Sequence, residues 1–232
     1  DGVSHTAAAL VGADGLWSTV RAVIVGDGAP RRAGHICYRA IVPVDTIPKV
    51  HRRNAMVLWV GPRCHLVLWP MRQDRYYNIT AVFHSDRHTE GGDAPGSPEE
   101  LFERFAPTRP EVRQVLEGVE DWRMFVLSDR EPVRNWSRGR VTLLGDAAHP
   151  TTQYMAQGAC MAMEDAVTLG EALRVCDQDW SRALDMYQKA RIGRTARIVL
   201  SSREMGRIYH AQGVERWVRN DLWRGRPAER FY

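Results

Sequence analysis

One short segment combines a carboxylate with the kind of backbone that binds polar cofactors. An apolar run at residues 141–144 is followed directly by Gly145 and Asp146, and Pro150 ends the turn. Gly158 then opens an alanine- and methionine-rich stretch with helical character. A carboxylate at a strand end accepts hydrogen bonds from hydroxyls, and the free N–H groups of a first helical turn favour negative charge. These residue types, in this order, predict a site for a polar cofactor.

A second segment, near the N-terminus, follows the same logic. Gly12 and Gly15 flank Asp14 in a turn after the apolar residues 6–11. Glycine lets the backbone approach a ligand, Asp14 can anchor the turn, and Ser18 is placed to cap a short helix. An ordinary strand–turn–helix connection has the same residues, so this segment alone names no ligand.

The start of the later helical stretch is built from small side chains. Gly158, Ala159 and Cys160 stand there, after Gln157. A flat aromatic ring can lie against such a helix end. Close packing of a helix against a strand explains the same residues equally well.

Composition and charge narrow the class of protein. The chain has 232 residues, 44% hydrophobic and 26% charged, which is typical of a globular protein with one large or two smaller domains. No apolar run approaches the ~20 residues that cross a membrane. The net charge is +4 and the arginines are scattered, so solvated helix faces are favoured over a nucleic-acid surface.

The cysteines show no metal-binding or disulfide spacing. Cys37, Cys64, Cys160 and Cys176 contain no CxxC pair, and each has apolar neighbours in the sequence. We therefore expect buried, reduced thiols, no metal site and a cytoplasmic protein.

The elements that would position these residues fall into successive regions. The pattern predicts a mixed α/β (α+β) fold: a strand, turn and helix first, then an antiparallel sheet, then a strand with helices. A turn is expected at residues 1–2 and a loop at 90–98. The expected strands are residues 6–11, 36–43, 55–60, 64–70, 76–83 and 141–144. The expected helices are a short one beginning at Ser18 and residues 99–105, 110–116, 158–175 and 181–209.

Together, the three segments resemble the aromatic-ring hydroxylases, the class A flavoprotein monooxygenases. Residues 12–21 are similar to that family's second fingerprint and residues 145–150 to its third. Residues 151–166 and 201–209 are most similar to 3-hydroxybenzoate 6-hydroxylases, with salicylate hydroxylases as the nearest alternative. The family's G-x-G-x-x-G unit is missing, so we expect a fragment that alone need not bind FAD tightly or turn over.

The resemblance implies a fold and a cofactor site. It implies the remainder of an FAD-binding Rossmann-like domain (1–32 and 137–176), an antiparallel-sheet substrate domain (33–136) and C-terminal helices (177–232). The residues implied to hold FAD are Asp14, Gly15, Arg21, Gly145, Asp146, Pro150, Gly158 and Ala159. For Arg21, pairing with a surface acid is the open alternative. Cys160 departs from the family, where many members carry Asn beside the flavin.

The resemblance also implies a reaction. NADH, or alternatively NADPH, would reduce FAD, and O2 would form a flavin C4a-hydroperoxide that hydroxylates an aromatic acid. The expected substrate is 3-hydroxybenzoate and the product gentisate, with no nucleic-acid or membrane partner and with a homodimer left open. A salicylate hydroxylase or another FAD oxidoreductase would share both fingerprints. A non-enzymatic basic binding module is the remote alternative.

His65 is the candidate that would accept the phenol proton. It lies on the expected strand 64–70, where two-residue alternation puts it on one face with Trp69. Histidine accepts protons near neutral pH, and a phenolate is a better nucleophile than a phenol. A core histidine bonded to backbone is the alternative.

Gln153 is the second catalytic candidate implied by the resemblance. It lies between the third fingerprint and the helical stretch that follows. Its amide can donate to and accept from a phenol or carboxylate. Trp69 and Tyr154 would supply aromatic walls, and His149 is expected to be structural.

Overall fold

The structure is a computed structural model that describes residues 2–85 and 94–226. Its contacts divide the chain into two compact units, residues 1–33 with 128–205, and residues 34–127 with 206–232. Residue 1 of the expected turn and residues 90–93 of the expected loop at 90–98 lie outside the described residues. The rest of that expected loop is partly wrong, because residues 94–95 form a short strand and Pro98 begins a helix. The division into four ranges remains a prediction.

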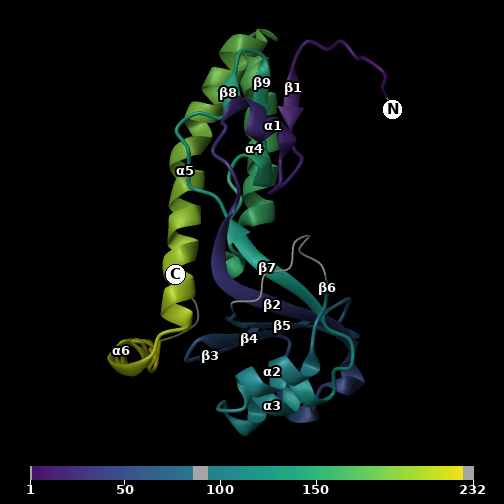
Figure 1. The fold of residues 1–232 in the computed structure, drawn as a ribbon, viewed down its shortest axis with the longest axis vertical. Helices are drawn as coiled ribbons and strands as arrows, with labels where there is room; N and C mark the ends of the chain where they lie inside the picture. The colour runs from purple at the N-terminus through teal and green to yellow at the C-terminus, as the bar shows by residue number, and fades with distance from the viewer. Residues whose placement is uncertain (1, 86–93, 227–232) are drawn as a thin grey trace. The chain divides into compact units, whose positions relative to one another are not determined.

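The first unit contains a small sheet with helices against it (Figure 1). Its strand order is β1-β9-β8, with β1 parallel and β8 antiparallel to β9. Leu143, Leu169, Leu184 and Tyr187 are buried in its core. Its elements are β1 (Leu10–Gly12), α1 (Thr19–Ile24), β8 (Ser137–Arg138), β9 (Val141–Leu143), the 3-10 turns Gly145–Ala147 and Gln153–Met155, α4 (Gly158–Val175) and most of α5 (Trp180–Tyr209).

The second unit contains a larger sheet with strand order β3-β4-β5-β2-β7-β6. Neighbouring strands from β3 to β2 are antiparallel, as are β6 and β7. Helices α2 and α3 lie on one face (Figure 1). The elements are β2 (Arg31–Pro43), 3-10 turns Val44–Thr46 and Lys49–His51, β3 (Val57–Gly61), β4 (Cys64–Met71), β5 (Tyr76–His84), β6 (Ala94–Pro95), α2 (Pro98–Phe105), α3 (Pro110–Glu117), β7 (Arg123–Asp129) and α6 (Gly213–Trp223).

The start of α2 shows how local sequence produces an element and its packing. Ser97 Oγ accepts a hydrogen bond from the Glu100 N–H at 3.2 Å, and Pro98 occupies the first turn, where a missing N–H costs nothing. Leu101 and Phe105 are then buried in the same cluster as Leu66 of β4. The expected mixed α/β fold with an antiparallel sheet is confirmed.

Some elements differ from those expected. The strand expected at residues 6–11 is only Leu10–Gly12 long. Helix α5 continues through Gly193 and Gly206, because the buried Leu184, Tyr187 and Val199 outweigh a cost of about 1 kcal/mol per glycine. Strands β7 and β8 and helix α6 were not expected.

The thiols depart from expectation at one position. All four cysteines are free, and Cys37, Cys64 and Cys176 are buried as expected. Cys160 is exposed, so the expectation of burial was wrong there. It belongs to the first turn of α4, where Ala159 is exposed as well, so apolar neighbours in the sequence did not indicate burial at this position.

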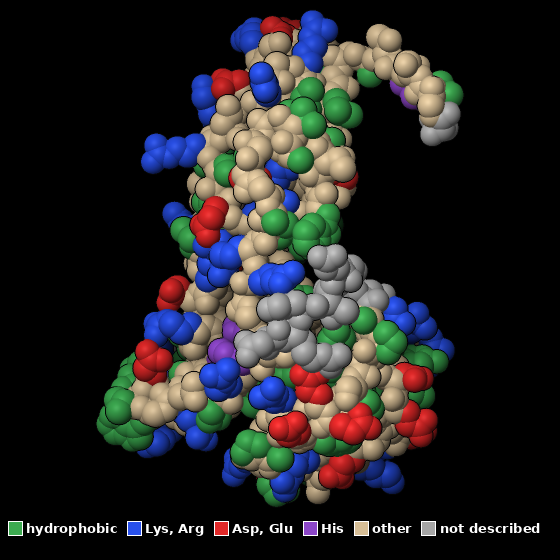
Figure 2. All heavy atoms as spheres, in the orientation of Figure 1, with side chains coloured by type: hydrophobic (Ala, Val, Ile, Leu, Met, Phe, Trp, Pro, Cys, Tyr) green, Lys and Arg blue, Asp and Glu red, His purple; other side chains and the backbone are tan. Residues whose placement is uncertain are grey.

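The surface bears on the expectation of scattered charge, and the helices bear on the expectation that no segment crosses a membrane. On the face shown in Figure 2, basic side chains are interspersed with acidic ones. Across the part of the chain that the structure describes, no helix is long and apolar enough to cross a membrane.

Candidate active site

The turn after β9 depends on glycine. Gly145 has φ +60°, a left-handed conformation that disfavours other residues. A Cβ there would also lie only 3.2 Å from the Ala162 Cβ of α4. The Gly145 N–H donates to Asp165 Oδ2 at 2.9 Å, which ties the turn to the same helix.

The turn presents Asp146 beside the start of α4. Asp146 is exposed, and its Oδ1 lies 4.0 Å from where a Gly158 Cβ would stand. The residue before the helix, Gln157, makes no side-chain cap to the first turn. Although the residue is exposed, desolvation by the surrounding protein raises the pKa of Asp146, and nearby His149 opposes that shift. An accepting carboxylate thus stands next to N–H donors, which fits a cofactor with hydroxyls and an electron-rich ring edge.

Asp165 of α4 stabilises this turn through buried hydrogen bonds. It is fully buried and accepts hydrogen bonds from Gly145, from His149 Nε2 at 2.5 Å and from Arg191 Nε at 2.6 Å. Burial raises the pKa of Asp165, but the bonds from His149 and Arg191 outweigh it and leave the pKa below its usual value. Nδ1 of His149 is buried and has no hydrogen-bond partner among the described residues.

Arg21 of α1 also hydrogen-bonds the backbone of this turn. Its side chain is fully buried, and NH1 donates to the carbonyl oxygens of Ala147 and Ala148 at 3.0 and 2.6 Å. Nε and NH2 donate to Asp27 at 2.6–3.0 Å, and NH2 also donates to Glu131 O. Arg21 therefore pairs with an acid and holds the backbone after Asp146. Its contact with a cofactor remains a prediction.

Asp14 anchors the turn in which Gly15 also stands. Its carboxylate accepts from Ser18 Oγ at 2.5 Å and from the N–H groups of Thr19 and Val20 at 2.8 and 3.2 Å. The Ser18 bond is the largest cause that lowers the Asp14 pKa to about 2. Ser18 Oγ in turn accepts from Arg21 N at 2.8 Å, so the expected cap of α1 is confirmed.

His65 lies in the second unit, on β4 opposite Val60 and Val82. It is 2% exposed, and its Nδ1 is 2.7 Å from His210 Nε2, so its partner is a second histidine. Burial lowers the pKa of His65 to about 3, with His35 adding to the shift. The ring is therefore neutral at pH 7 and has a nitrogen that can accept a hydrogen bond, while its burial disfavours a ring that keeps a second proton.

The comparison with known proteins decides the family. Residues 4–202 match the FAD binding domain family. The chain belongs to this family. It is 57% identical over 231 residues to a 3-hydroxybenzoate 6-hydroxylase of Polaromonas naphthalenivorans, matching all of this chain and 58% of that protein. It is also 57% identical to 3-hydroxybenzoate 6-hydroxylase 2 of Aquipseudomonas alcaligenes, across all of this chain and 72% of that protein. The resemblance to class A flavoprotein hydroxylases is confirmed.

Solved structures of this FAD-binding family share the fold. A salicylate hydroxylase substrate complex matches with a TM-score of 0.85 and 25% identity, covering 95% of this chain and 60% of that one. Klebsiella pneumoniae HpxO with FAD and uric acid matches with a TM-score of 0.80 and 29% identity, over 96% and 56%. The chain thus spans a little over half the length of several relatives.

The remaining predicted residues of this FAD-binding chain lie in separate units. In the first unit Pro150 and Tyr154 are buried, Gly158 and Gln153 are half-buried, and Ala159 is exposed. Trp69 is half-buried on β4 of the second unit. Gln153 and Tyr154 belong to one unit, and His65 and Trp69 belong to the other, so a pocket that all four share remains a prediction.

Sequence reasoning missed several residues that organise these sites. Asp165 carried a signal: Met161, Leu169 and Ala172 are buried on the same side of α4, so an acid at that spacing had to be paired. His210 carried none, because it is 145 residues from His65. Only the fold shows that pairing.

Proposed function

We propose that the full-length protein carrying this chain is an FAD-dependent 3-hydroxybenzoate 6-hydroxylase. It would use NADH and O2 to convert 3-hydroxybenzoate to gentisate. The observation that carries this proposal is 57% identity, along the whole chain, with proteins of that name. The exposed Asp146 beside the uncapped start of α4 supplies a matching cofactor site.

The first unit would hold the cofactor. When bound, FAD supplies the redox chemistry that takes electrons from NADH and delivers one oxygen atom of O2 to the ring. Asp146 would accept hydrogen bonds from FAD hydroxyls, and the N–H groups at Gly158 and Ala159 would stabilise negative charge on the flavin. Pro150 would bound the flavin side of the pocket. Asp14, Gly15 and Arg21 would keep the two fingerprint turns in place.

The second unit would supply the proton acceptor. His65 is neutral at pH 7, so it can hydrogen-bond the substrate hydroxyl and take its proton as the ring becomes a nucleophile. Gln153 would orient the substrate through its amide, and Trp69 and Tyr154 would form aromatic walls.

Product analysis tests this function. The full-length protein, purified with FAD, is incubated with 3-hydroxybenzoate and either NADH or NADPH, and products are separated by liquid chromatography. We expect gentisate, with NADH consumed faster than NADPH. Turnover of salicylate without gentisate would favour the salicylate hydroxylase alternative. Sedimentation of the same preparation measures whether it is a homodimer.

His65→Ala tests the proton acceptor. We expect the hydroxylation rate to fall by roughly 10²–10⁴-fold, the usual contribution of a positioned acid–base group, while FAD content stays constant. His51→Gln is the matched control, because His51 is also a buried histidine of the second unit. An unchanged rate in His65→Ala would remove His65 from the mechanism.

A further inference from the structure

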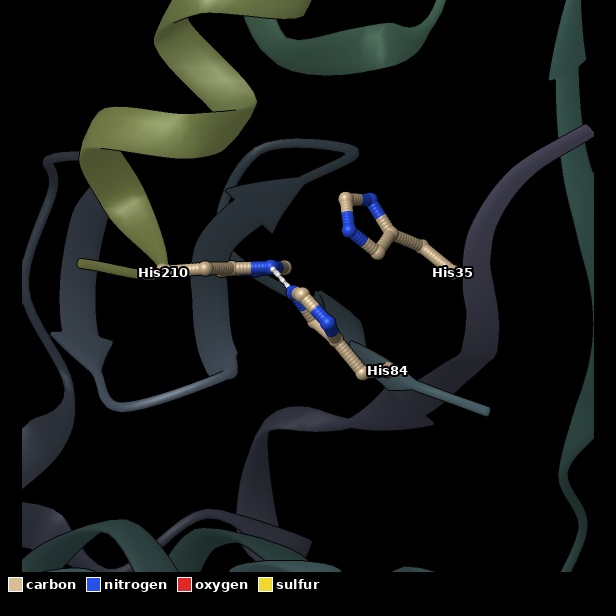
Figure 3. A group of neighbouring side chains, drawn as sticks. All are labelled: His35, His84 and His210. Carbon is tan, nitrogen blue, oxygen red and sulfur yellow. Dashed lines mark hydrogen bonds between the residues drawn. The ribbon is translucent and has the colours of Figure 1, made fainter. Parts of the chain in front are cut away.

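Three histidines of the second unit form a continuous hydrogen-bonded row. His65 Nδ1 lies 2.7 Å from His210 Nε2, and His210 Nδ1 lies 3.0 Å from His84 Nε2. Figure 3 shows His210 reaching His84 from the end of α5, with the His35 ring beside them. We call His65, His210 and His84 the histidine row.

Backbone contacts fix the far members of the row. Arg63, in the turn between β3 and β4, donates its N–H to His210 O and accepts from the His84 N–H, both at 3.1 Å. Arg219 of α6 donates to Tyr209 O at 2.7 Å, next to His210. The rings are therefore held in register by the main chain as well as by each other.

The row runs from a buried ring to a half-exposed one. His65 and His210 are 2% and 4% exposed, whereas His84 is half-buried at the end of β5. The His35 ring packs against His84 with ring centroids 4.2 Å apart. A proton that reaches His84 is thus closer to water than one on His65.

Neutral imidazole chemistry limits the row to two proton arrangements. Each neutral ring has one N–H donor and one accepting nitrogen, and both nitrogens of His210 face other rings. In one arrangement His65 Nδ1–H donates to His210, and His210 Nδ1–H donates to His84. In the other arrangement every donor and acceptor is reversed.

The surroundings keep these rings from storing a proton. Burial, with His35 adding to the shift, lowers the pKa of His65 to about 3, and burial together with Arg63 lowers the pKa of His84 to about 4. Burial, the other histidines and Arg219 lower the pKa of His210 further still. A ring that takes a proton here must pass one on.

We propose that the histidine row is a proton relay that carries the substrate's phenolic proton from His65 to His84 and on to water. This rests on the proposed function. His65 Nε2 takes the phenolic proton while its Nδ1 proton moves to His210 Nε2. The His210 Nδ1 proton moves to His84 Nε2, and His84 releases its own Nδ1 proton. One proton enters and one leaves, the substrate becomes a phenolate, and no ring keeps a charge.

An alternative is that three neighbouring histidines bind a divalent metal ion. His35, His84 and His210 offer ligand atoms within 4.8 Å of one another. However, the charged side chains that depress the pKa of His84 and His210 are arginines, which repel a cation. Nitrogens of His84 and His210 already bond one another, which favours the relay.

The test measures proton release by the full-length, FAD-loaded protein. Stopped-flow mixing with 3-hydroxybenzoate in weak buffer, with a pH indicator, follows proton release, and ultraviolet absorbance follows phenolate formation. We expect His210→Gln and His84→Gln each to slow both signals by roughly tenfold or more, with substrate Kd and FAD content unchanged. Glutamine keeps a hydrogen bond at these positions but does not pass a proton through its amide.

Controls separate a relay from a structural effect. Added imidazole should restore the rate in His84→Ala, at the half-exposed end, and His51→Gln should leave it unchanged. His84→Gln keeps the test open if the buried His210 variant does not fold. Wild-type rates of proton release in both glutamine variants would overturn the relay. Loss of activity on chelation, with recovery on adding Zn²⁺, would overturn it in favour of a metal site. Absence of gentisate from the wild-type protein would instead refute the proposed function.

Discussion

Asp165 is a residue whose effect on the cofactor site is indirect. It binds Gly145, His149 and Arg191 at once and is fully buried. Asp165→Asn removes the charge that pairs with Arg191, and breaking a buried pair costs about 3–5 kcal/mol. We expect that loss in the free energy of unfolding by urea, together with weaker FAD retention in the full-length protein. Glu171→Gln, which breaks an exposed pair with Arg174, should cost at most about 1 kcal/mol. Equal losses in the two variants would contradict this role.

At the residue scale, the sequence predicted which neighbouring residues lie together better than it predicted their distant hydrogen-bond partners. Gly145, Asp146 and Gly158 lie together as expected, because adjacent positions and a strand-to-helix order place them. For Arg21 the sequence left a cofactor contact and a pair with an acid both open. Its donors meet Asp27 and the Ala147 and Ala148 carbonyls, and a contact with the cofactor remains a prediction. The partners of Arg21 lie up to 127 residues away, beyond the reach of local pattern.

At the element scale, the join between β9 and α4 depends on one glycine. Gly145→Ala would place a methyl group 3.2 Å from Ala162 Cβ and force a left-handed alanine, which alone costs about 1–2 kcal/mol. Gly170→Ala, in the same α4, meets nothing within 4 Å and should instead stabilise the helix by about 1 kcal/mol. Urea unfolding of both variants measures the difference. If both substitutions changed the free energy of unfolding by a similar amount in the same direction, the turn would tolerate a side chain.

The N-terminus of α1 gives a pH dependence. The Asp14 pKa is about 2, below the ordinary value of 3.8, because Ser18 and the first N–H groups of α1 bond the carboxylate. A group whose pKa is lower in the folded state stabilises the fold above its unfolded pKa. This contribution is present above about pH 4 and is lost as the pH falls toward 2. Thermal unfolding across that range should be less steeply pH-dependent in Asp14→Asn. Parallel pH profiles for variant and wild type would exclude Asp14 as a cause.

Some helices and strands could be predicted from local sequence patterns, whereas others are seen only in the folded structure. Helix α2 was predicted because its capping residues and apolar spacing agree with its tertiary packing. Helix α4 has no side-chain cap and was predicted from its alanine- and methionine-rich composition, and its buried Met161, Leu169 and Ala172 recur at helical spacing. Helix α6 was missed although Val214, Trp217, Val218 and Leu222 recur at helical spacing in the sequence, and in the structure these side chains are exposed. Strand β7 was missed because its apolar run, residues 124–127, is too short to distinguish a strand from a helix by periodicity, and its place between β2 and β6 is seen only in the fold.

At the scale of the whole molecule, the chain passes between its two units after residues 33, 127 and 205. The buried carboxylate of Asp129 lies close in the chain to one of these points and bonds residues close to the other two. Asp129 bonds Arg31 at 2.7–2.8 Å and Arg203 at 2.8–3.2 Å, all on the first unit's side. These charged residues fix where the three segments leave the first unit. These residues are far apart in the sequence, so no local pattern predicts their ion pairs and only the folded structure shows them.

The exposed thiol at the start of α4 makes the cofactor site observable without turnover. Cys160 is exposed, whereas Cys37, Cys64 and Cys176 are buried. Brief treatment of the native chain with a maleimide should modify Cys160 first, as peptide mass spectrometry can show, and denaturant should open the other three thiols. Comparable early modification of a buried cysteine would contradict the fold at that position. In the full-length protein, FAD should slow the labelling of Cys160, so alkylation kinetics become a footprint of whatever covers the first turn of that helix.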